Sequence, residues 1–388
     1  MRNFCLIIFF LLLPVSCESQ PGEVIFPGAE RSKEYLKLLE GKSTGVVANH
    51  TSLVGEIHLV DFLISRKINI ERIYSPEHGF RGTEDAGAAI QSGFDKKTGI
   101  RIVSLYGKRK KPAAKDLEEI DIMIFDLQDV GLRFYTYIST MHYVMEACAE
   151  NNIPVIVLDR PNPNADYIDG PVLEIEHRSF VGMHPVPVVY GMTIGEYARM
   201  INGEKWLKGG MQCDLTVIKC ENYSHSSVYK LPVRPSPNLP NYNSVRLYPS
   251  LCFFEGTIIS VGRGTDFPFQ VFGHPELQTG DFYFTPESKP GAAINPRLQG
   301  EKCRGIDLRD YENPESIKKI NLDYLLLAYQ NYPKKEKFFN SYFNSLSGNE
   351  DLKNQIIEGK TTKQIRSSWS EGLEKFRKVR ERYLLYGE

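Results

Sequence analysis

The first half of the chain alternates short apolar runs with helix-like segments, and this alternation limits the fold more than any other feature. Helices are expected over 55–67, 136–151 and 192–204, the second with apolar residues at helical spacing. The strand candidates are "TGVVAN" (44–49), "INIERIYS" (68–75), "IRIVSLYG" (100–107), "IDIMIFDLQ" (120–128), "IPVIVLDR" (153–160) and "CDLTVIKC" (213–220). Nearly continuous apolar strands alternating with helices predict an α/β fold, a Rossmann-like αβα sandwich with a mostly parallel sheet.

Polar segments follow the strand candidates. They are "NHTS" with Asn49, "SPEHGFRG" (75–82), "DLQDVGLRFYTY" (126–137) and "DRPNP" (159–163). Ligands bind at the carboxyl ends of the strands in such sheets, so a site is expected at this edge. The chain has neither a GxGxxG turn nor a P-loop, and therefore no nicotinamide, flavin or other cofactor is predicted.

The length of 388 residues suits two domains. A proline-rich stretch, "LPVRPSPNLPNYNS" (231–244), is typical of an extended connection. We therefore expect a Rossmann-like catalytic domain over 25–225 and a smaller α+β C-terminal domain over 226–388 that completes a cleft. The 47 basic and 48 acidic residues nearly cancel, which argues against a nucleic-acid partner.

The N-terminus resembles a secretory signal, expected over residues 1–16. Arg2 precedes an apolar run from Phe4 to Leu13 that is too short to span a bilayer. Leu13 to Cys17 resembles a bacterial lipobox, in which Cys17 would carry the lipid. Pro14 is atypical there, and ordinary cleavage is the alternative. The prediction is an exported periplasmic or cell-envelope lipoprotein, held to the membrane only through this anchor.

The cysteines and histidines give no metal pattern. Five cysteines beyond the signal are scattered without ligand spacing, and buried free thiols are expected; they are Cys148, Cys213, Cys220, Cys252 and Cys303. The histidines form neither HxH nor HExxH, and the acidic residues lack EF-hand spacing, so no metal is predicted.

Glu77 and His78 stand at the end of a predicted buried strand. A glutamate held at the mouth of a cleft suits a general acid, whereas a turn in which Glu77 accepts backbone N–H bonds is the structural alternative. Arg81 and Glu84 follow in the same polar loop and are candidates for substrate binding.

The segment after the strongest strand carries Asp129, Arg133, Tyr135 and Tyr137. Carboxylates, hydroxyls and aromatic faces together are typical of sugar binding, and a structural ion pair between Asp126 and Arg133 is the alternative. In "DRPNP" the flanking prolines would fix Asn162, although a rigid turn explains them equally well.

Later in the chain, "SVGRGTDF" sets Arg263 between two glycines, with Asp266 close behind. Glycine neighbours allow an arginine to approach a ligand, and its fork suits a carboxylate. Glu255 and His274 are expected to be satisfied, half-buried groups.

Several long blocks resemble the NamZ-type exo-β-N-acetylmuramidases, glycoside hydrolase family 171, formerly a family of unknown function. The blocks are "YSPEHGFRG", "DLQDVGLRFYTYISTM", "LDRPNP", "SFVGMHPVPVVYGMTIGE", "RPSPNLP" and "YPSLCFFEGTIISVGRGTDFPFQVFGHP", spanning roughly residues 44–275. The resemblance implies a Rossmann-like domain, a smaller C-terminal domain and an active site between them. It also implies release of N-acetylmuramic acid from the non-reducing end of peptidoglycan fragments, with Glu77 as the family's glutamate.

The second catalytic group stays open at this point. Glycoside hydrolysis normally needs a second carboxylate, and a 2-acetamido sugar can instead use its own carbonyl. Asp129, Glu84, Glu174 and Asp266 are the candidates, of which we favour Asp129. Arg263, Arg133 and Arg81 are expected to bind the lactyl carboxylate, and Tyr135 or Tyr137 to support the sugar.

Two other functions compete with this one. A non-catalytic, surface-anchored binder of peptidoglycan would carry the same signal and lipobox. An esterase on a doubly wound fold would need a GxSxG elbow, which the sequence lacks.

Overall fold

The computed structural model describes residues 23–77, 79–81, 93–107 and 109–388. A seven-stranded sheet forms the first part, in the order β5-β6-β4-β1-β7-β8-β9. Its strands are β1 (Ser43–Ala48), β4 (Asn69–Ser75), β5 (Gly93–Phe94), β6 (Arg101–Ser104), β7 (Ile122–Asp126), β8 (Val155–Leu158) and β9 (Leu215–Ile218). All neighbours pair in parallel except β5 with β6. From β6 to β9 this is the doubly wound order of Rossmann folds, so the predicted α/β class is confirmed.

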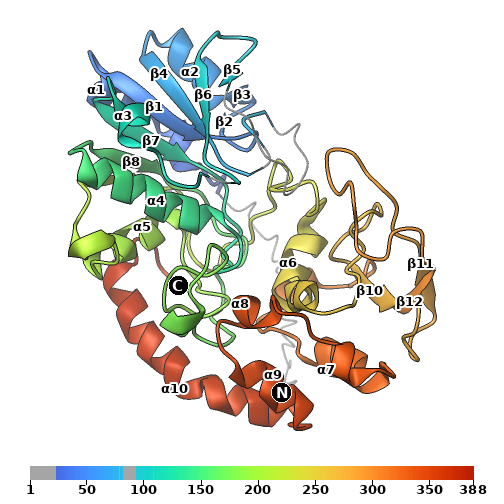
Figure 1. Cartoon of the computed structure of the whole chain (residues 1–388). Coiled ribbons are helices and arrows are strands. Elements are labelled where there is room, and N and C mark those ends of the chain that lie inside the picture. The colour runs from blue at the N-terminus through green and yellow to red at the C-terminus, as the bar shows by residue number, and fades with distance from the viewer. Residues whose placement is uncertain (1–22, 78, 82–92, 108) are drawn as a thin grey trace, which may run out of the picture.

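Helices cover both faces of this sheet (Figure 1). The helices of this part are α1 (Ser32–Leu39), α2 (Leu59–Ser65), α3 (Ala114–Leu117), α4 (Tyr137–Glu150) and α5 (Ile194–Gly203). Alternate residues of each strand face opposite cores: Val46 packs in the cluster of α1 and α2, and Val47 in that of α4 and α5. Period-two burial on both faces is what a covered parallel sheet requires.

The expected helix over 55–67 is wrong in its first turn. A short hairpin of β2 (Leu53–Val54) and β3 (Ile57–His58) precedes α2, which begins at Leu59. His58 ends the hairpin because its Nδ1 accepts a hydrogen bond from Val60 N at 3.2 Å and so caps the helix.

The second part contains a three-stranded antiparallel sheet of order β10-β12-β11 with surrounding helices, which fits the predicted smaller α+β part. Its elements are α6 (Tyr242–Leu251), β10 (Val271–His274), β11 (Phe282–Phe284), β12 (Cys303–Asp307), α7 (Asp323–Asn331), α8 (Phe343–Ser347), α9 (Asp351–Ile357) and α10 (Thr362–Arg380). One hydrophobic core runs from α4 and α5 into this part, through Phe253, Phe272 and Phe343.

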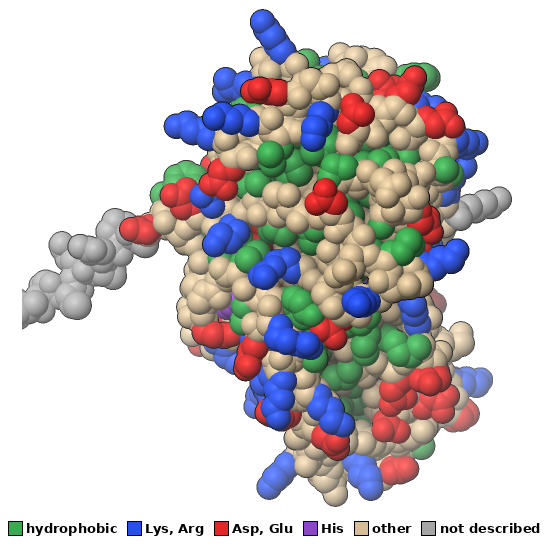
Figure 2. All heavy atoms as spheres, turned by 90° about the vertical axis from the view of Figure 1, so that its left-hand side faces the viewer, with side chains coloured by type: hydrophobic (Ala, Val, Ile, Leu, Met, Phe, Trp, Pro, Cys, Tyr) green, Lys and Arg blue, Asp and Glu red, His purple; other side chains and the backbone are tan. Residues whose placement is uncertain are grey.

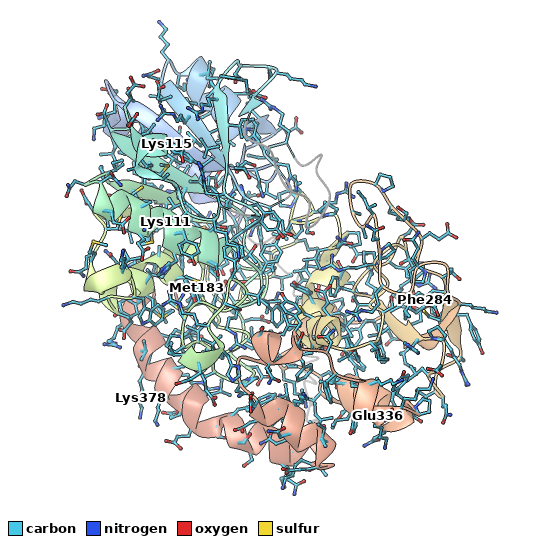
Figure 3. The ribbon with its side chains drawn as sticks, viewed as in Figure 1. Lys111, Lys115, Met183, Phe284, Glu336 and Lys378 are labelled. Atoms are coloured by element: carbon cyan, nitrogen blue, oxygen red, sulfur yellow. The ribbon has the colours of Figure 1, made fainter. Side chains whose placement is uncertain are left out.

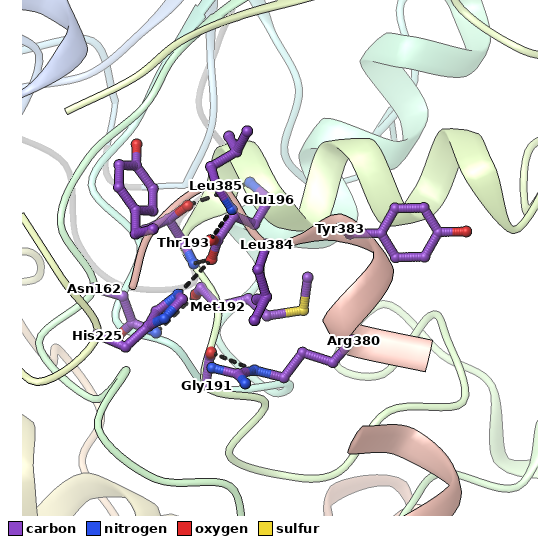
Figure 4. Close-up of polar contacts among 12 residues, drawn as sticks. Asn162, Gly191, Met192, Thr193, Glu196, His225, Arg380, Tyr383, Leu384 and Leu385 are labelled. Carbon is purple, nitrogen blue, oxygen red and sulfur yellow. Dashed lines mark hydrogen bonds and ion pairs between the residues drawn. The ribbon is translucent and has the colours of Figure 1, made fainter. Parts of the chain in front are cut away.

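The C-terminal end returns to the first part. Figure 1 shows α10 running back toward α5, and Figure 4 shows the contacts of the chain that follows it. Glu196 Oε1 accepts a hydrogen bond from Leu385 N at 2.7 Å, and Arg380 Nε donates to Gly191 O at 2.8 Å. Tyr386 Oη donates to Asp159 Oδ2 at 2.6 Å. The last residues therefore complete the hydrogen bonding of the first part.

The surface and the cysteines agree with an ordinary globular chain. Basic, acidic and hydrophobic side chains are interspersed on the face that Figure 2 turns to the viewer. The five described cysteines are buried and free, as predicted. Among the helices of the described residues, none is long and apolar enough to cross a bilayer.

Candidate active site

Three neighbouring cavities lie beyond the carboxyl edge of the large sheet, with volumes of about 800, 60 and 530 Å³. We call them cavities 1, 2 and 3. Glu77 and Arg263 line all three, and Glu255 and Tyr342 line cavities 1 and 3. In Figure 3, Lys111 and Lys115 mark the first part of the chain and Phe284 and Glu336 the second. Both parts of the chain contribute to the cavity walls. Glu77 of the first part and Arg263 of the second therefore lie at the same site.

Glu77 follows β4 directly, after Ser75 and Pro76, and is half-buried. Thr136 Oγ1 donates to its Oε2 at 3.3 Å. Burial and then the charge of Glu77 raise the pKa of Tyr106 and that of Tyr137, so both phenols stay protonated beside it. Glu77 thus sits among hydroxyl donors and aromatic rings at a strand end.

Glu255 and Arg263 form a two-pronged ion pair. Arg263 Nε lies 2.6 Å from Glu255 Oε1, and Nη2 lies 3.1 Å from Oε2. Burial disfavours the charge of the guanidinium, but the Glu255 carboxylate outweighs it and raises the pKa of Arg263. The guanidinium therefore stays charged beside Glu255, whose side chain faces cavities 1 and 3. Glu255 is a half-buried, satisfied group, as expected from the sequence; its place in the cavity wall was not predicted.

Tyr135 and Tyr137 line cavity 2. Their rings meet edge to face with centroids 4.8 Å apart. Tyr135 Oη donates to Pro235 O at 2.7 Å, and Asn49 Nδ2 donates to Tyr137 Oη at 2.7 Å. The structure thus brings both tyrosines to Glu77, while Asn49 is fully buried behind Tyr137 and lines none of the three cavities.

Arg133 lies away from the cavities, fully buried. Its Nη1 donates to Pro171 O and Val186 O, both at 2.8 Å, and its Nη2 donates to the carbonyls of Leu346 and Ser347 at 2.9 and 2.6 Å. Those four carbonyls occupy the fork that was expected to bind a substrate carboxylate. The alternative of an Asp126–Arg133 ion pair is wrong as well, because Asp126 pairs with Arg160.

Asp129 is also buried and lines none of the three cavities. Tyr190 Oη and Gly131 N donate to its Oδ2, the latter at 2.7 Å. Burial raises the pKa of Asp129 to about 7, and these donors lower it only in part. Asp129 therefore accepts hydrogen bonds within its own turn and does not reach the wall of the cavities that Glu77 lines.

Asn162 serves the same turn. Its side chain donates to Met192 O at 2.8 Å and accepts from Asn164 N at 2.8 Å. Gly131 has a φ of +78°, and a Cβ there would lie 2.3 Å from the Asn162 amide. This close approach requires a glycine at position 131. The Asn162 side chain is used within the turn and lines none of the three cavities.

The remaining predicted residues lie elsewhere or outside the described residues. Arg81 is paired with Asp95 at 2.9 and 2.8 Å, and Asp266 pairs with Lys289 at an exposed position. His78, Glu84 and Cys17 fall outside the described residues. In the described part of the chain, no cluster of three His, Cys, Asp or Glu side chains is arranged for a metal ion.

Two residues that line the cavities were not predicted from the sequence. Tyr342 precedes α8, and Arg297 belongs to a loop between β11 and β12, within "GAAINPRLQG". Both line cavity 1. Neither lies in a recognisable motif, and only the fold brings them to Glu77.

Comparison with known proteins gives a consistent result. The domain family described as "Exo-beta-N-acetylmuramidase NamZ, N-terminal" matches residues 44–243, and "Exo-beta-N-acetylmuramidase NamZ, C-terminal" matches residues 246–386. The Peptidoglycan beta-N-acetylmuramidase NamZ of Bacillus subtilis (strain 168) is 40% identical over 376 residues, covering 91% of this chain and 89% of that protein.

Two crystal structures of DUF1343 family proteins from Bacteroides fragilis share the fold. One superposes with a TM-score of 0.88 at 45% identity, covering 94% of this chain and 99% of that one. The other has a TM-score of 0.80 at 30% identity and covers 94% of this chain and 100% of that one.

Proposed function

Because the chain belongs to the NamZ family of exo-β-N-acetylmuramidases, we propose that it releases N-acetylmuramic acid from the non-reducing end of peptidoglycan fragments. One observation carries the proposal beyond family membership. Glu77, from the family's SPEHG block, and Arg263, from the second part, line the same three cavities. The active site of this proposal is the space between the two parts.

Glu77 is proposed as the general acid. It protonates the glycosidic oxygen as the bond from C1 to that oxygen breaks, and the shortened saccharide leaves as an alcohol. Water then adds its oxygen to C1 and transfers a proton to a carboxylate of the site: to Glu255 if water attacks directly, or to the now ionised Glu77 if an intermediate forms first. Support comes from the location of Glu77 at a strand end, with Thr136, Tyr106 and Tyr137 around it.

Glu255 is proposed as the second carboxylate, in place of Asp129. Among the described residues, Glu77 and Glu255 are the acidic side chains that line these cavities. The salt bridge with Arg263 holds the Glu255 carboxyl group in one orientation at the cavity wall. Its proposed role is that of a base, a nucleophile or a group that orients the substrate's acetamido carbonyl. The carboxylate separation of the substrate complex decides among these roles: about 5–5.5 Å in retaining and about 6.5–9.5 Å in inverting enzymes.

The test is incubation with a muramyl-glucosamine disaccharide, followed by NMR of the first-formed anomer. Turnover is expected in the wild type and none in Glu77→Gln, whose fold is checked by circular dichroism. Glu276→Gln is the matched control, because Glu276 pairs with Lys334 at the surface and lines none of the three cavities. Full turnover in Glu77→Gln removes that residue from the mechanism. Tight binding of the sugar without wild-type turnover supports the binder instead of the enzyme.

We also propose that the chain is exported and that Cys17 carries a lipid. The support is the signal and the lipobox alone. Cell fractionation should find the wild type with membranes and Cys17→Ser in the soluble fraction. Equal partition of both proteins would contradict the anchor.

A further inference from the structure

We propose that Arg297 binds the lactyl carboxylate of the muramyl sugar and thereby makes cavity 1 the subsite for the released residue. The inference rests on the proposed function, because the lactyl ether is what distinguishes N-acetylmuramic acid from N-acetylglucosamine. Recognition of the lactyl carboxylate is thereby assigned to Arg297, in the loop between β11 and β12.

Arg297 is the arginine of the site that holds no carboxylate. Its Nη2 donates to the backbone carbonyl of Glu255 at 3.3 Å, and among the described residues it makes no ion pair. Arg263, by contrast, has both Nε and Nη2 on the Glu255 carboxylate. A substrate carboxylate would compete with Glu255 for Arg263. Arg297 lines cavity 1, and no carboxylate among the described residues competes for its N–H donors.

The loop that carries Arg297 is fixed against the Arg263 turn. Gly264 has a φ of +83°, and a Cβ there would lie 2.4 Å from Glu287 O and 2.6 Å from Pro296 Cγ. Glu287 N donates to Gly264 O at 2.9 Å, closing the contact. The glycine after Arg263 therefore lets the loop pack closely and sets the position of the residue next to Pro296.

A second contact holds the loop from the other side. Asn238 Nδ2, in the proline-rich connection, donates to Ala292 O at 2.9 Å. Ala292 and Arg297 both line cavity 1. The backbone that carries Arg297 is thus held at two points. Less conformational entropy of this loop is therefore lost when a ligand binds to the guanidinium.

The charge of cavity 1 suits an anion. Its wall holds two arginines, Arg263 and Arg297, of which Glu255 neutralises one. In the proposed mechanism Glu77 enters the reaction with its proton, which leaves one net positive charge. Desolvation by the surrounding protein lowers the pKa of Arg297, and the charge of Glu255 acts in the opposite direction. An anionic ligand would relieve that cost, and the planar fork matches a carboxylate with two hydrogen bonds.

The assignment orders the substrate along the site. If the lactyl group lies in cavity 1, we place the leaving saccharide in cavity 3, which shares Glu77 with cavity 1. That cavity has its own cation, Lys110, whose Nζ lies 4.2 Å from the Phe180 ring centroid. Lys110 is therefore the rival for the carboxylate, and the experiment must separate the two.

The test compares two substrates that differ in one group: a nitrophenyl β-muramide with a free lactyl acid and the same compound as its lactyl amide. The wild type should prefer the acid in kcat/KM by about 10- to 100-fold, the range of a hydrogen bond to a charged group. Arg297→Met should lose that preference, because the substitution slows the acid much more than the amide. Arg297→Lys should retain part of it.

Arg304→Met is the matched control. Arg304 also donates to a backbone carbonyl, Gly280 O at 2.7 Å, and it lines none of the three cavities. It should keep the wild-type preference. An unchanged preference in Arg297→Met, or its loss in Lys110→Met alone, overturns the inference.

A binding measurement keeps the inference separate from the proposed function. Calorimetry with free N-acetylmuramic acid and N-acetylglucosamine should show selectivity for the acid in the wild type and its loss in Arg297→Met. If the wild type turns over neither substrate yet shows this selectivity, the proposed enzyme fails and the Arg297 subsite stands. Equal binding of both sugars by the wild type overturns the subsite.

Discussion

The Arg263 guanidinium holds the Glu255 carboxylate with two hydrogen bonds, Nε to Oε1 at 2.6 Å and Nη2 to Oε2 at 3.1 Å. This contact holds the carboxyl group of Glu255, the proposed second catalytic group, in one orientation. Removing the charge while keeping the shape should therefore isolate its chemical role.

Glu255→Gln should lower kcat by about 10²- to 10⁴-fold with a small change in KM, because the amide can neither accept a proton nor stabilise positive charge at C1. Steady-state kinetics on the muramyl-glucosamine disaccharide measure this effect. In Glu255→Ala, which leaves room for a small anion, external azide or formate should restore part of the rate if Glu255 acts as base or nucleophile. A variant with wild-type kcat would exclude Glu255 from the reaction.

Arg133→Met should destabilise the fold without touching the cavities. The substitution leaves four buried carbonyls without their donor, on both parts of the chain: Pro171, Val186, Leu346 and Ser347. We expect a loss of about 3–5 kcal/mol in the free energy of unfolding, measured by denaturant titration. Arg377→Met, on the exposed side of α10, should change it by less than about 0.5 kcal/mol. Equal stability of the two variants would contradict a stabilising role for the four hydrogen bonds of Arg133.

Asp129→Asn should change how stability depends on pH. Burial raises the pKa of Asp129 to about 7 in the folded state, against 3.8 for a free aspartate. The folded state then holds its proton more tightly, so this contribution is complete below pH ~4 and is lost as the pH rises through about 7. The loss amounts to about 4 kcal/mol at most. The variant should fall less than the wild type between pH 4 and 8 in unfolding titrations, and parallel curves would refute the assignment.

Tyr386→Phe tests the C-terminal contacts. The Tyr386 hydroxyl donates to Asp159 Oδ2 at 2.6 Å and accepts from Cys220 N at 2.8 Å. Its removal leaves a buried carboxylate with one donor fewer, and we expect a loss of about 1–3 kcal/mol. Tyr283→Phe, at a position 51% exposed, should have no measurable effect. Thermal melts of the two variants make the comparison, and overlapping melts would show that the tail is dispensable.

The sequence predicts the large sheet well because its information is local. β-branched runs such as that of β7 determine strands directly, and polar residues after them lie at one edge once the sheet is parallel. The position of Glu77 at the carboxyl edge of the sheet could therefore be predicted from the sequence. The partners of the other candidates depend on distant chain, as Arg133 shows: it looks like a ligand-binding arginine but bonds to Leu346, 213 residues away. Arg297 shows the converse, since nothing beside it in the sequence marks it, and packing of Pro296 on Gly264 brings it to the site.

Leu385 and Tyr386 also tie α5 and the residue after β8 to a distant part of the chain. Glu196 and Asp159, both buried in the first part, receive donors from Leu385 and Tyr386. Each carboxylate also has donors within the first part of the chain: Thr193 Oγ1 and Gly195 N for Asp159, and Thr193 N for Glu196. Leu385 and Tyr386 therefore add to a network that the first part already makes. A chain cut before residue 384 should keep its sheet and become more open to protease around α5.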